Sequence, residues 1–157
     1  DVFPPERCDT AHQKGIGAMV RAMWVYTSYP LPARKDMKIF IAGSFVARER
    51  LQPMRDALNS MGHIVQSTWL EDGEEVWGDP AACLLAVTRD LEEIRASDAI
   101  ILDTLTVTTF GNSYTEWGYG LSRLGGKYLV GPPRNHYHYL ATKQFDTWEM
   151  ALEFFRP

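Results

Sequence analysis

The sequence contains little cysteine and no long hydrophobic run. Cys8 and Cys83 are the only two cysteines among 157 residues, and they form no CxxC pair. Their spacing supports neither a disulfide framework nor a zinc site. No stretch approaches the roughly 20 apolar residues that a membrane-spanning helix needs. These absences favour a protein of a reducing compartment, and we expect a cytoplasmic location without a membrane partner.

An excess of positive charge is missing as well. Sixteen Lys and Arg residues face 20 Asp and Glu residues, which gives a formal net charge of -4 and a pI near 5.5. Proteins that hold nucleic acid polymers neutralise many phosphates with basic side chains. The charge therefore argues against a polymer and favours a small ligand. The length and the hydrophobic content of 45% suit a single globular core.

A change in composition near residue 36 divides the chain. Prolines in the segment 29–32 and charged residues at 34–36 precede a regular pattern of short apolar runs. We expect residues 37–157 to form the folded domain. Residues 1–36 are expected to be an N-terminal extension, whose role the sequence leaves open.

Short apolar runs that alternate with helical spacings indicate an α/β domain. Apolar runs predict strands, and apolar residues that recur at spacings of three and four predict helices. Because such strands are apolar throughout, we expect a parallel sheet with helices on both faces. Strands are predicted at 38–42, 63–67, 99–102, 128–130 and 144–145, and buried helix stripes at 51–61, 84–94, 114–124 and 148–155.

Two positions mark the ends of predicted helices, and a third interrupts one. Gly62 stands where a C-terminal cap belongs, and Thr147 is expected to cap the last helix. Pro53 lies within the first helical pattern, where it either kinks the helix or marks the start of its regular part.

Candidate ligand-binding residues follow the predicted strands, because open parallel sheets bind ligands beyond the carboxyl ends of their strands. Gly43, Ser44 and Phe45 follow the first strand and open a helix, a geometry that presents backbone amides to a sugar hydroxyl or a phosphate. Trp69 follows the second strand and either stacks on a nucleobase or packs in the core. Asp103 ends the third strand, where it contacts a ligand or caps the next loop.

Further polar side chains are candidates near the same strand ends. Arg48 and Arg50 could clamp a 5'-phosphate or simply lie exposed on the surface. Asn112 precedes a helix and either bonds to a base edge or caps that helix. His136 and His138 lack a nearby third ligand, so we expect no metal site.

Glu116 lies near the start of the helix predicted at 114–124. Unsatisfied backbone amides and the helix dipole at this position favour a negative charge, and an ionised carboxylate can act as a nucleophile. The alternative role is structural, because Ser113 and Glu116 fit the S-x-x-E capping box. The residues alone leave both roles open.

Four segments occur in a characteristic succession. They are Met-Lys-Ile-Phe-Ile-Ala-Gly-Ser-Phe at 37–45, Asp-Leu-Glu-Glu-Ile-Arg-Ala-Ser-Asp at 90–98, Gly-Asn-Ser-Tyr-Thr-Glu-Trp-Gly-Tyr-Gly at 111–120 and Lys-Tyr-Leu-Val-Gly at 127–131. In order and spacing they resemble the nucleoside 2-deoxyribosyltransferase family and its nucleotide N-glycosidase relatives. The likeness extends from residue 37 to about residue 155.

The resemblance implies a flavodoxin-like, five-stranded parallel sheet, a homo-oligomer and transfer of 2-deoxyribose between nucleobases without a cofactor. Glu116 matches the family nucleophile, which would form a covalent glycosyl ester. Asp90 matches the family aspartate near the sugar, although from the residues alone it is equally a charge on a helix surface. The implied partners are a nucleoside or nucleoside monophosphate and a free nucleobase. Many relatives carry an aspartate in the loop before the nucleophile, where this chain has Phe-Gly-Asn at 110–112.

Two alternatives to transfer stay open. The first is hydrolysis of the N-glycosidic bond of (deoxy)nucleoside 5'-monophosphates, with water as the acceptor. The second is a non-catalytic nucleotide-binding module in which Glu116 only caps its helix.

Overall fold

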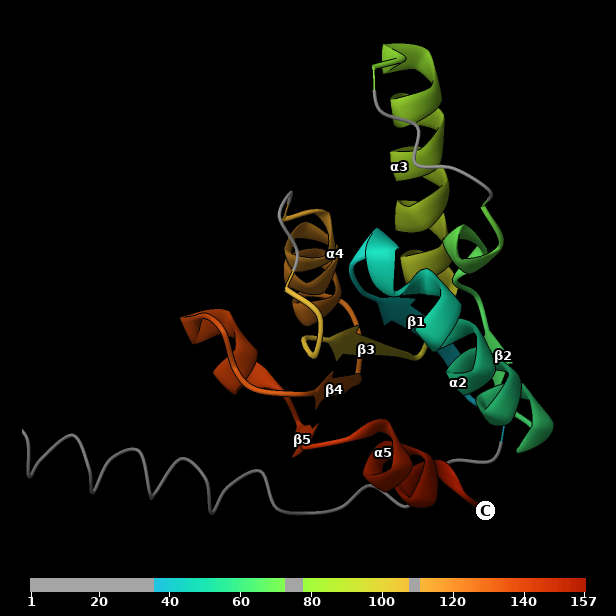
Figure 1. Ribbon diagram of the computed structural model, residues 1–157, viewed down its shortest axis with the longest axis vertical. Coiled ribbons are helices and arrows are strands. Elements are labelled where there is room, and N and C mark those ends of the chain that lie inside the picture. The colour runs from blue at the N-terminus through green and yellow to red at the C-terminus, as the bar shows by residue number, and fades with distance from the viewer. Residues whose placement is uncertain (1–35, 73–77, 108–110) are drawn as a thin grey trace, which may run out of the picture. The chain divides into compact units, whose positions relative to one another are not determined.

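The computed structural model describes residues 36–72, 78–107 and 111–157, which form one α/β domain (Figure 1). The predicted N-terminal extension and Cys8 lie outside the described residues, so the expectations for them stay predictions. The elements are β1 (Lys38–Ala42), η1 (Phe45–Ala47), α2 (Arg48–Ser60), β2 (Ile64–Val65), η2 (Thr68–Glu71), α3 (Pro80–Ala96), β3 (Ala99–Asp103), α4 (Asn112–Leu121), β4 (Gly126–Val130), η3 (His136–Leu140), β5 (Lys143–Phe145) and α5 (Trp148–Phe155).

The strands form one five-stranded sheet in the order β2-β1-β3-β4-β5, and every pair in it is parallel. This is the flavodoxin-like order, so the predicted fold class is confirmed. All five residues of the central strand β3 are buried, as expected for a strand covered on both faces. The order reverses between β1 and β3, which places the topological switch point at the carboxyl ends of these two strands.

Helices cover both faces of the sheet, as predicted. α2 packs beside α5, whereas α3 packs beside α4 on the other face (Figure 1). The core between these layers contains aliphatic side chains from the strands, among them Ile39, Ile41 and Ile101, which are fully buried. Near α5 the core is aromatic, because the Tyr128 ring meets the Phe155 ring edge-on at 5.0 Å between centroids.

Helix α2 ends as predicted, with Gly62 beyond its last turn. Gly62 has a φ of +94°, which a residue with a side chain adopts only under strain. Its N–H donates to the Asn59 carbonyl, and the N–H of His63 donates to the Leu58 carbonyl. These two bonds satisfy carbonyls that the helix leaves free. Pro53 lies inside the helix and does not end it.

The second strand is shorter than predicted, since only Ile64–Val65 of the segment 63–67 pairs with β1. The N–H of Gln66 still donates to the Ile39 carbonyl. One step further the hydroxyl of Ser67, instead of a backbone carbonyl, accepts the N–H of Ile41. A side-chain hydrogen bond thus replaces the next backbone hydrogen bond between β1 and β2, and the backbone continues into η2.

Helix α3 corrects the predicted burial of the stripe at 84–94. Ile94 is buried, but Leu84 is 68% exposed and Val87 is 53% exposed. The physical reason is position, because the first half of α3 extends past the sheet and packs on none of the strands (Figure 1). Leu85, at 72%, is exposed as well. None of the helices in the described part of the chain is long and apolar enough to cross a membrane.

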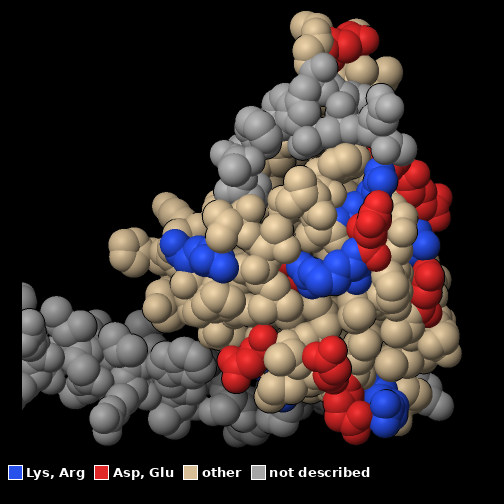
Figure 2. All heavy atoms as spheres, in the orientation of Figure 1, with Lys and Arg blue, Asp and Glu red and all other residues tan. Residues whose placement is uncertain are grey.

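Charges of both signs share the surface. On the face seen in Figure 2, basic side chains form separate small groups next to acidic ones. Such a face lacks the broad basic stripe that tracks a phosphate backbone.

Candidate active site

The loops after β1 and β3 meet at the switch point of the sheet. Gly43, directly after β1, has no space for a side chain, because a Cβ there would lie 2.8 Å from Leu51 Cδ1 and 3.5 Å from Asp103 Cβ. Glycine therefore lets α2 approach the strand ends closely. Ser44 follows as a buried polar residue at the N-terminal side of η1.

Glu116 does not cap its helix. The N-cap of α4 is Gly111, with a φ of +74°, and no side chain bonds to the free amides there. Ser113 Oγ is buried without a hydrogen-bond partner. Glu116 Oε2 is buried without a partner too. The capping-box interpretation is therefore wrong, and α4 holds a buried carboxylate oxygen that no group in the described part of the chain satisfies.

The expectation that Glu116 is held ionised by the helix start is also wrong. Glu116 is the fifth residue of α4, beyond the first turn in which the free amides act. Burial, followed by the charges of Asp90 and Glu93, raises the pKa of Glu116 to about 8. A free site at neutral pH consequently holds a proton on this carboxyl group.

Asp90 on α3 lies close enough to Glu116 for the two charges to interact. Its carboxylate accepts hydrogen bonds from Arg89, at 3.3 Å from Nε and 3.2 Å from Nη2. Burial raises the pKa of Asp90 to about 6, against the lowering effect of Arg89. The structure thus brings together Asp90 and Glu116, the two residues predicted to be catalytic.

Three further residues surround this pair, and the sequence analysis missed them as site residues. Arg89 also grips Asp72, at 3.0 and 2.8 Å to its two carboxylate oxygens. Glu93 accepts hydrogen bonds from the backbone N–H and the hydroxyl of Thr68 on η2. Burial raises the pKa of Glu93. The spacing of Asp90 and Glu93 on one helix was the available signal, because residues three apart share a face.

Asp103, predicted to bind substrate, is bonded to protein groups instead. Its side chain is fully buried, and both carboxylate oxygens accept from the Arg50 guanidinium, at 2.8 and 3.1 Å. Trp148 Nε1 donates to the same carboxylate at 2.7 Å. Arg50 also donates to the Thr106 hydroxyl, 3.1 Å away. Asp103 and Arg50 therefore tie the end of β3 to α2, to α5 and to the loop that leads to α4.

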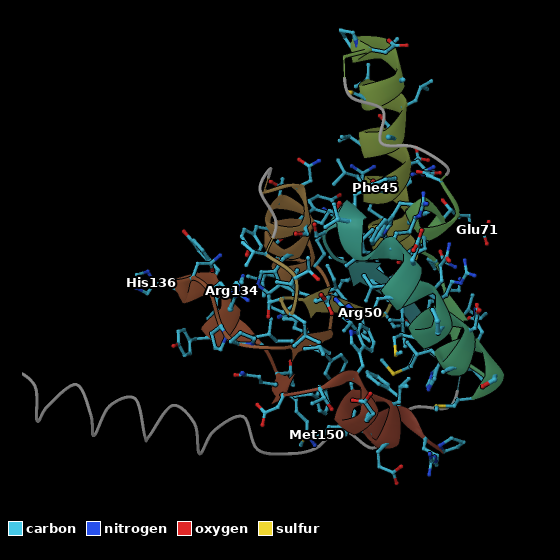
Figure 3. The ribbon with its side chains drawn as sticks, viewed as in Figure 1. Phe45, Arg50, Glu71, Arg134, His136 and Met150 are labelled. Atoms are coloured by element: carbon cyan, nitrogen blue, oxygen red, sulfur yellow. The ribbon has the colours of Figure 1, made fainter. Side chains whose placement is uncertain are left out.

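Arg48 differs from Arg50 in having free donors. Its guanidinium carbon lies 5.0 Å from the centre of the Phe45 ring, a cation–π arrangement. Its Nε and Nη1 are buried and have no hydrogen-bond partner. Phe45 and Arg50, both labelled in Figure 3, lie on the same η1–α2 segment. A half-buried cation whose Nε and Nη1 have no partner among the described residues is suited to an anionic ligand.

The two other predicted ligand contacts, Trp69 and Asn112, lie in different surroundings. Trp69 is buried, and its indole N–H donates to the Ile41 carbonyl at 2.8 Å. The centre of its ring lies 6.5 Å from the centre of the Phe45 ring, so Trp69 packs against η1. Asn112 is exposed as the first residue of α4, and Gly111 occupies the cap position.

The short helix η3, in which Figure 3 labels His136, is attached to α4. Trp117 Nε1 donates to the Tyr137 carbonyl at 3.2 Å. The buried His138 ring lies edge-on to the Tyr114 ring, 5.1 Å between centroids. Burial, and then Arg134, lowers the pKa of His138. These contacts hold the face of α4 that carries Tyr114 and Trp117 against η3. No set of three or more potential metal ligands occurs among the described residues.

Known structures share this architecture, whereas no protein-family profile and no curated protein matches the sequence. A 2-deoxyribosyltransferase from Bacillus psychrosaccharolyticus superimposes with a TM-score of 0.62 at 19% identity, over 73% of this chain and 90% of the other. The fold is shared. The CMP N-glycosidase of Clostridium botulinum matches with a TM-score of 0.50 at 14% identity, over 74% and 95%. A conserved protein from Enterococcus faecalis matches with a TM-score of 0.57 at 13% identity, over 76% and 97%.

Proposed function

We propose that this protein belongs with the nucleoside 2-deoxyribosyltransferases and cleaves N-glycosidic bonds, transferring 2-deoxyribose between nucleobases. The observation that carries the proposal is the unpartnered, buried oxygen of Glu116 beside the carboxylate of Asp90. Two enzymes that share the fold are a 2-deoxyribosyltransferase and a CMP N-glycosidase. The segments that resemble the family carry both carboxylates.

The first half of the reaction uses one proton and one carboxylate. A Glu116 oxygen attacks C1' of the sugar, and the C1'–N bond breaks with its electron pair going to the nucleobase. The nucleobase takes a proton from the carboxyl group of Asp90. This requires the single proton of the pair to lie on Asp90 and Glu116 to be ionised. That placement is the reverse of the one that the two pKa values favour in the free site, so the minor form of the singly protonated pair reacts. The product is a glycosyl ester of Glu116.

The second half reverses these roles. A nitrogen of an incoming base attacks C1' and gives its proton to Asp90, while the Glu116 carboxylate leaves. Two inversions at C1' give net retention. Water in place of the base would give the hydrolase.

The test is base release from 2'-deoxynucleosides and their 5'-monophosphates, with and without a second free base. We expect product that requires the acceptor base. Glu116→Gln should lose roughly a thousandfold or more in kcat, because the amide is a poor nucleophile. Glu92→Gln is the matched control, since Glu92 is an exposed carboxylate on α3. Release without an acceptor would indicate hydrolysis, and ligand binding without any turnover would indicate the non-catalytic module.

A second candidate, action on nucleoside 5'-monophosphates, is favoured by Arg48. Its two buried donors lack partners, and leaving such groups unsatisfied costs stability. A phosphate would accept from both through a charge-assisted contact. Gly43 and Ser44, next to Phe45, would hold the sugar at the same strand end.

Arg48→Met distinguishes the two substrate classes. If Arg48 binds the phosphate, its removal should raise KM for a 5'-monophosphate about tenfold or more, with KM for the nucleoside unchanged. Arg55→Met serves as the control for loss of an arginine from the helix, because Arg55 on α2 pairs with Asp56 and Glu71 and its side chain is only 18% exposed. Equal effects on both substrates would contradict a phosphate contact.

A homo-oligomer is the expected assembly, and the exposed apolar residues of α3 support it. Leu84, Leu85 and Val87 all lie in the half of the helix that extends past the sheet. Exposed apolar residues gathered on one projecting element are typical of protein–protein contacts.

A further inference from the structure

Arg89 lies between two carboxylates that serve different purposes. Its Nη2 donates to Asp72 at 2.8 Å and to Asp90 at 3.2 Å. Nη1 completes a two-pronged contact with Asp72, and Nε reaches Asp90 at 3.3 Å. One guanidinium thus links the end of η2 to the acid/base residue on α3. Such forked contacts fix orientation as well as charge.

The carboxylates around this guanidinium outnumber it. Asp90 faces Glu93 on its own helix, Asp72 at the end of η2 and Glu116 on α4, and its charge interacts with each of them. Arg89 is the cation that hydrogen-bonds within this group, in the part of the chain that the structure describes. The electrostatic environment of Asp90 therefore depends on both Arg89 and Asp72.

We propose that Arg89 is a positioning residue, which holds the carboxyl group of Asp90 toward the reacting centre and is itself held in place by its ion pair with Asp72 at the end of η2. The proposal rests on the proposed function of Asp90 and Glu116. Arg89 itself touches Asp90 and Asp72, and the reacting atoms are contacted by the two carboxylates.

The two members of the ion pair should affect Asp90 in opposite directions. Arg89 lowers the pKa of Asp90, whereas the negative charge of Asp72 raises it. Arg89→Met should therefore raise the pKa of Asp90, and Asp72→Asn should lower it. If the ion pair of Arg89 with Asp72 had only a structural role, the two variants would break the same contact and would not shift the pKa of Asp90 in opposite directions.

The decisive measurement is a pH titration of ¹³C-labelled aspartate carboxyl groups by NMR, without substrate. Asp90→Asn assigns the resonance of Asp90. Opposite shifts in Arg89→Met and Asp72→Asn would support the proposal. Shifts in the same direction, or no shift in either variant, would overturn it. Arg95→Met is the control, because Arg95 is another arginine of α3 that bonds to a second element, the Tyr119 hydroxyl of α4, and it should leave the Asp90 titration unchanged.

Kinetics test the orienting role separately. Arg89→Lys keeps the charge and loses the fork, so we expect kcat to fall about tenfold with KM nearly unchanged and the Asp90 titration in place. An unchanged kcat in this variant would overturn the orienting role. If wild type turns over no substrate of the panel, the proposed function fails, whereas the titration still decides whether Arg89 controls the charge of Asp90.

Discussion

At the scale of a single residue, the Glu116 carboxyl group lowers the stability of the folded protein when it is ionised. Its Oε2 atom is buried and unpartnered, and its pKa is raised to about 8 from the ordinary value of 4.5. An acid with a raised folded-state pKa binds its proton more tightly in the folded protein than in the unfolded chain. The resulting stability is complete below pH 4.5 and is lost as the pH rises toward 8.

Replacement of this acid should consequently stabilise the protein. Glu116→Gln removes the ionisation, so its free energy of unfolding should exceed that of wild type by about 4 kcal/mol at pH 8. The difference should nearly vanish at pH 4. Urea denaturation at the two pH values measures it. A variant that is less stable than wild type at pH 8 would show that the carboxylate has a partner after all.

Activity should depend on the pH as a bell. The active form of the Asp90–Glu116 pair holds one proton, and the pair titrates near pH 6 and near pH 8. The value of kcat/KM should therefore decrease at pH values below about 6 and at pH values above about 8. Asp90→Asn should lose the alkaline limit, because no proton donor is left to titrate, and its residual activity should rise with the ionisation of Glu116, whose pKa falls once the charge of Asp90 is gone. Rates over a pH series for both proteins test this, and an alkaline limit that stays in place would contradict it.

Among the elements, β3 depends on contacts from outside the sheet. Asp103 at its end is fully buried between Arg50 of α2 and Trp148 of α5. Loss of one member of a buried ion pair leaves the other charge unpaired.

Asp103→Ala should therefore destabilise the fold by about 3 kcal/mol, since Arg50 and the Trp148 N–H lose their acceptor together. Glu153→Ala is the matched control, because its ion pair with Arg156 is exposed on both sides, and it should cost about 0.5 kcal/mol or less. Thermal and urea unfolding compare the two. Equal losses would mean that the buried pair contributes no more than a surface pair.

The elements also show what the sequence predicts and where it fails. Apolar runs identified β1, β3 and β4, because buried strands are apolar throughout, whereas β5 is Lys-Gln-Phe and only its phenylalanine is buried. Periodicity failed for the stripe of α3, because Leu84 and Val87 keep the spacing of a buried face while extending past the sheet. It failed for the role of Ser113, because a capping motif gives no information on whether the neighbouring Gly111 already occupies the cap position.

The site was predictable only in part, for a similar reason. Asp90 and Glu116 lie in segments that resemble a known family, so both could be selected from the sequence. Their partners could not be selected, since Arg89 and Asp72 lie 17 positions apart in the sequence and only the folding of the chain brings them together. Asp103 looked like a ligand contact because it ends a strand, but long-range pairing with Arg50 and Trp148 occupies it.

For the whole molecule, the exposed apolar residues of α3 predict association. Leu84→Asp combined with Leu85→Asp should convert a homo-oligomer into monomers, because charged residues at the centre of an interface are strongly disfavoured. Light scattering coupled to size-exclusion chromatography gives the mass of each form. Met150→Asp, an exposed change on α5 that Figure 3 labels, should leave the mass unchanged. A monomeric wild type would contradict the predicted assembly.

The partnership of Asp103 and Trp148 has a consequence for how the protein is made. The two residues lie 45 positions apart, and Trp148 is the later one. A nascent chain on the ribosome can pair β1 with β3 and attach Arg50, yet it carries the Asp103 carboxylate without its indole partner until α5 has emerged. Completion of the switch point therefore waits for the synthesis of α5, and a ribosome stalled before Trp148 would display a domain in which Asp103 still lacks its indole partner.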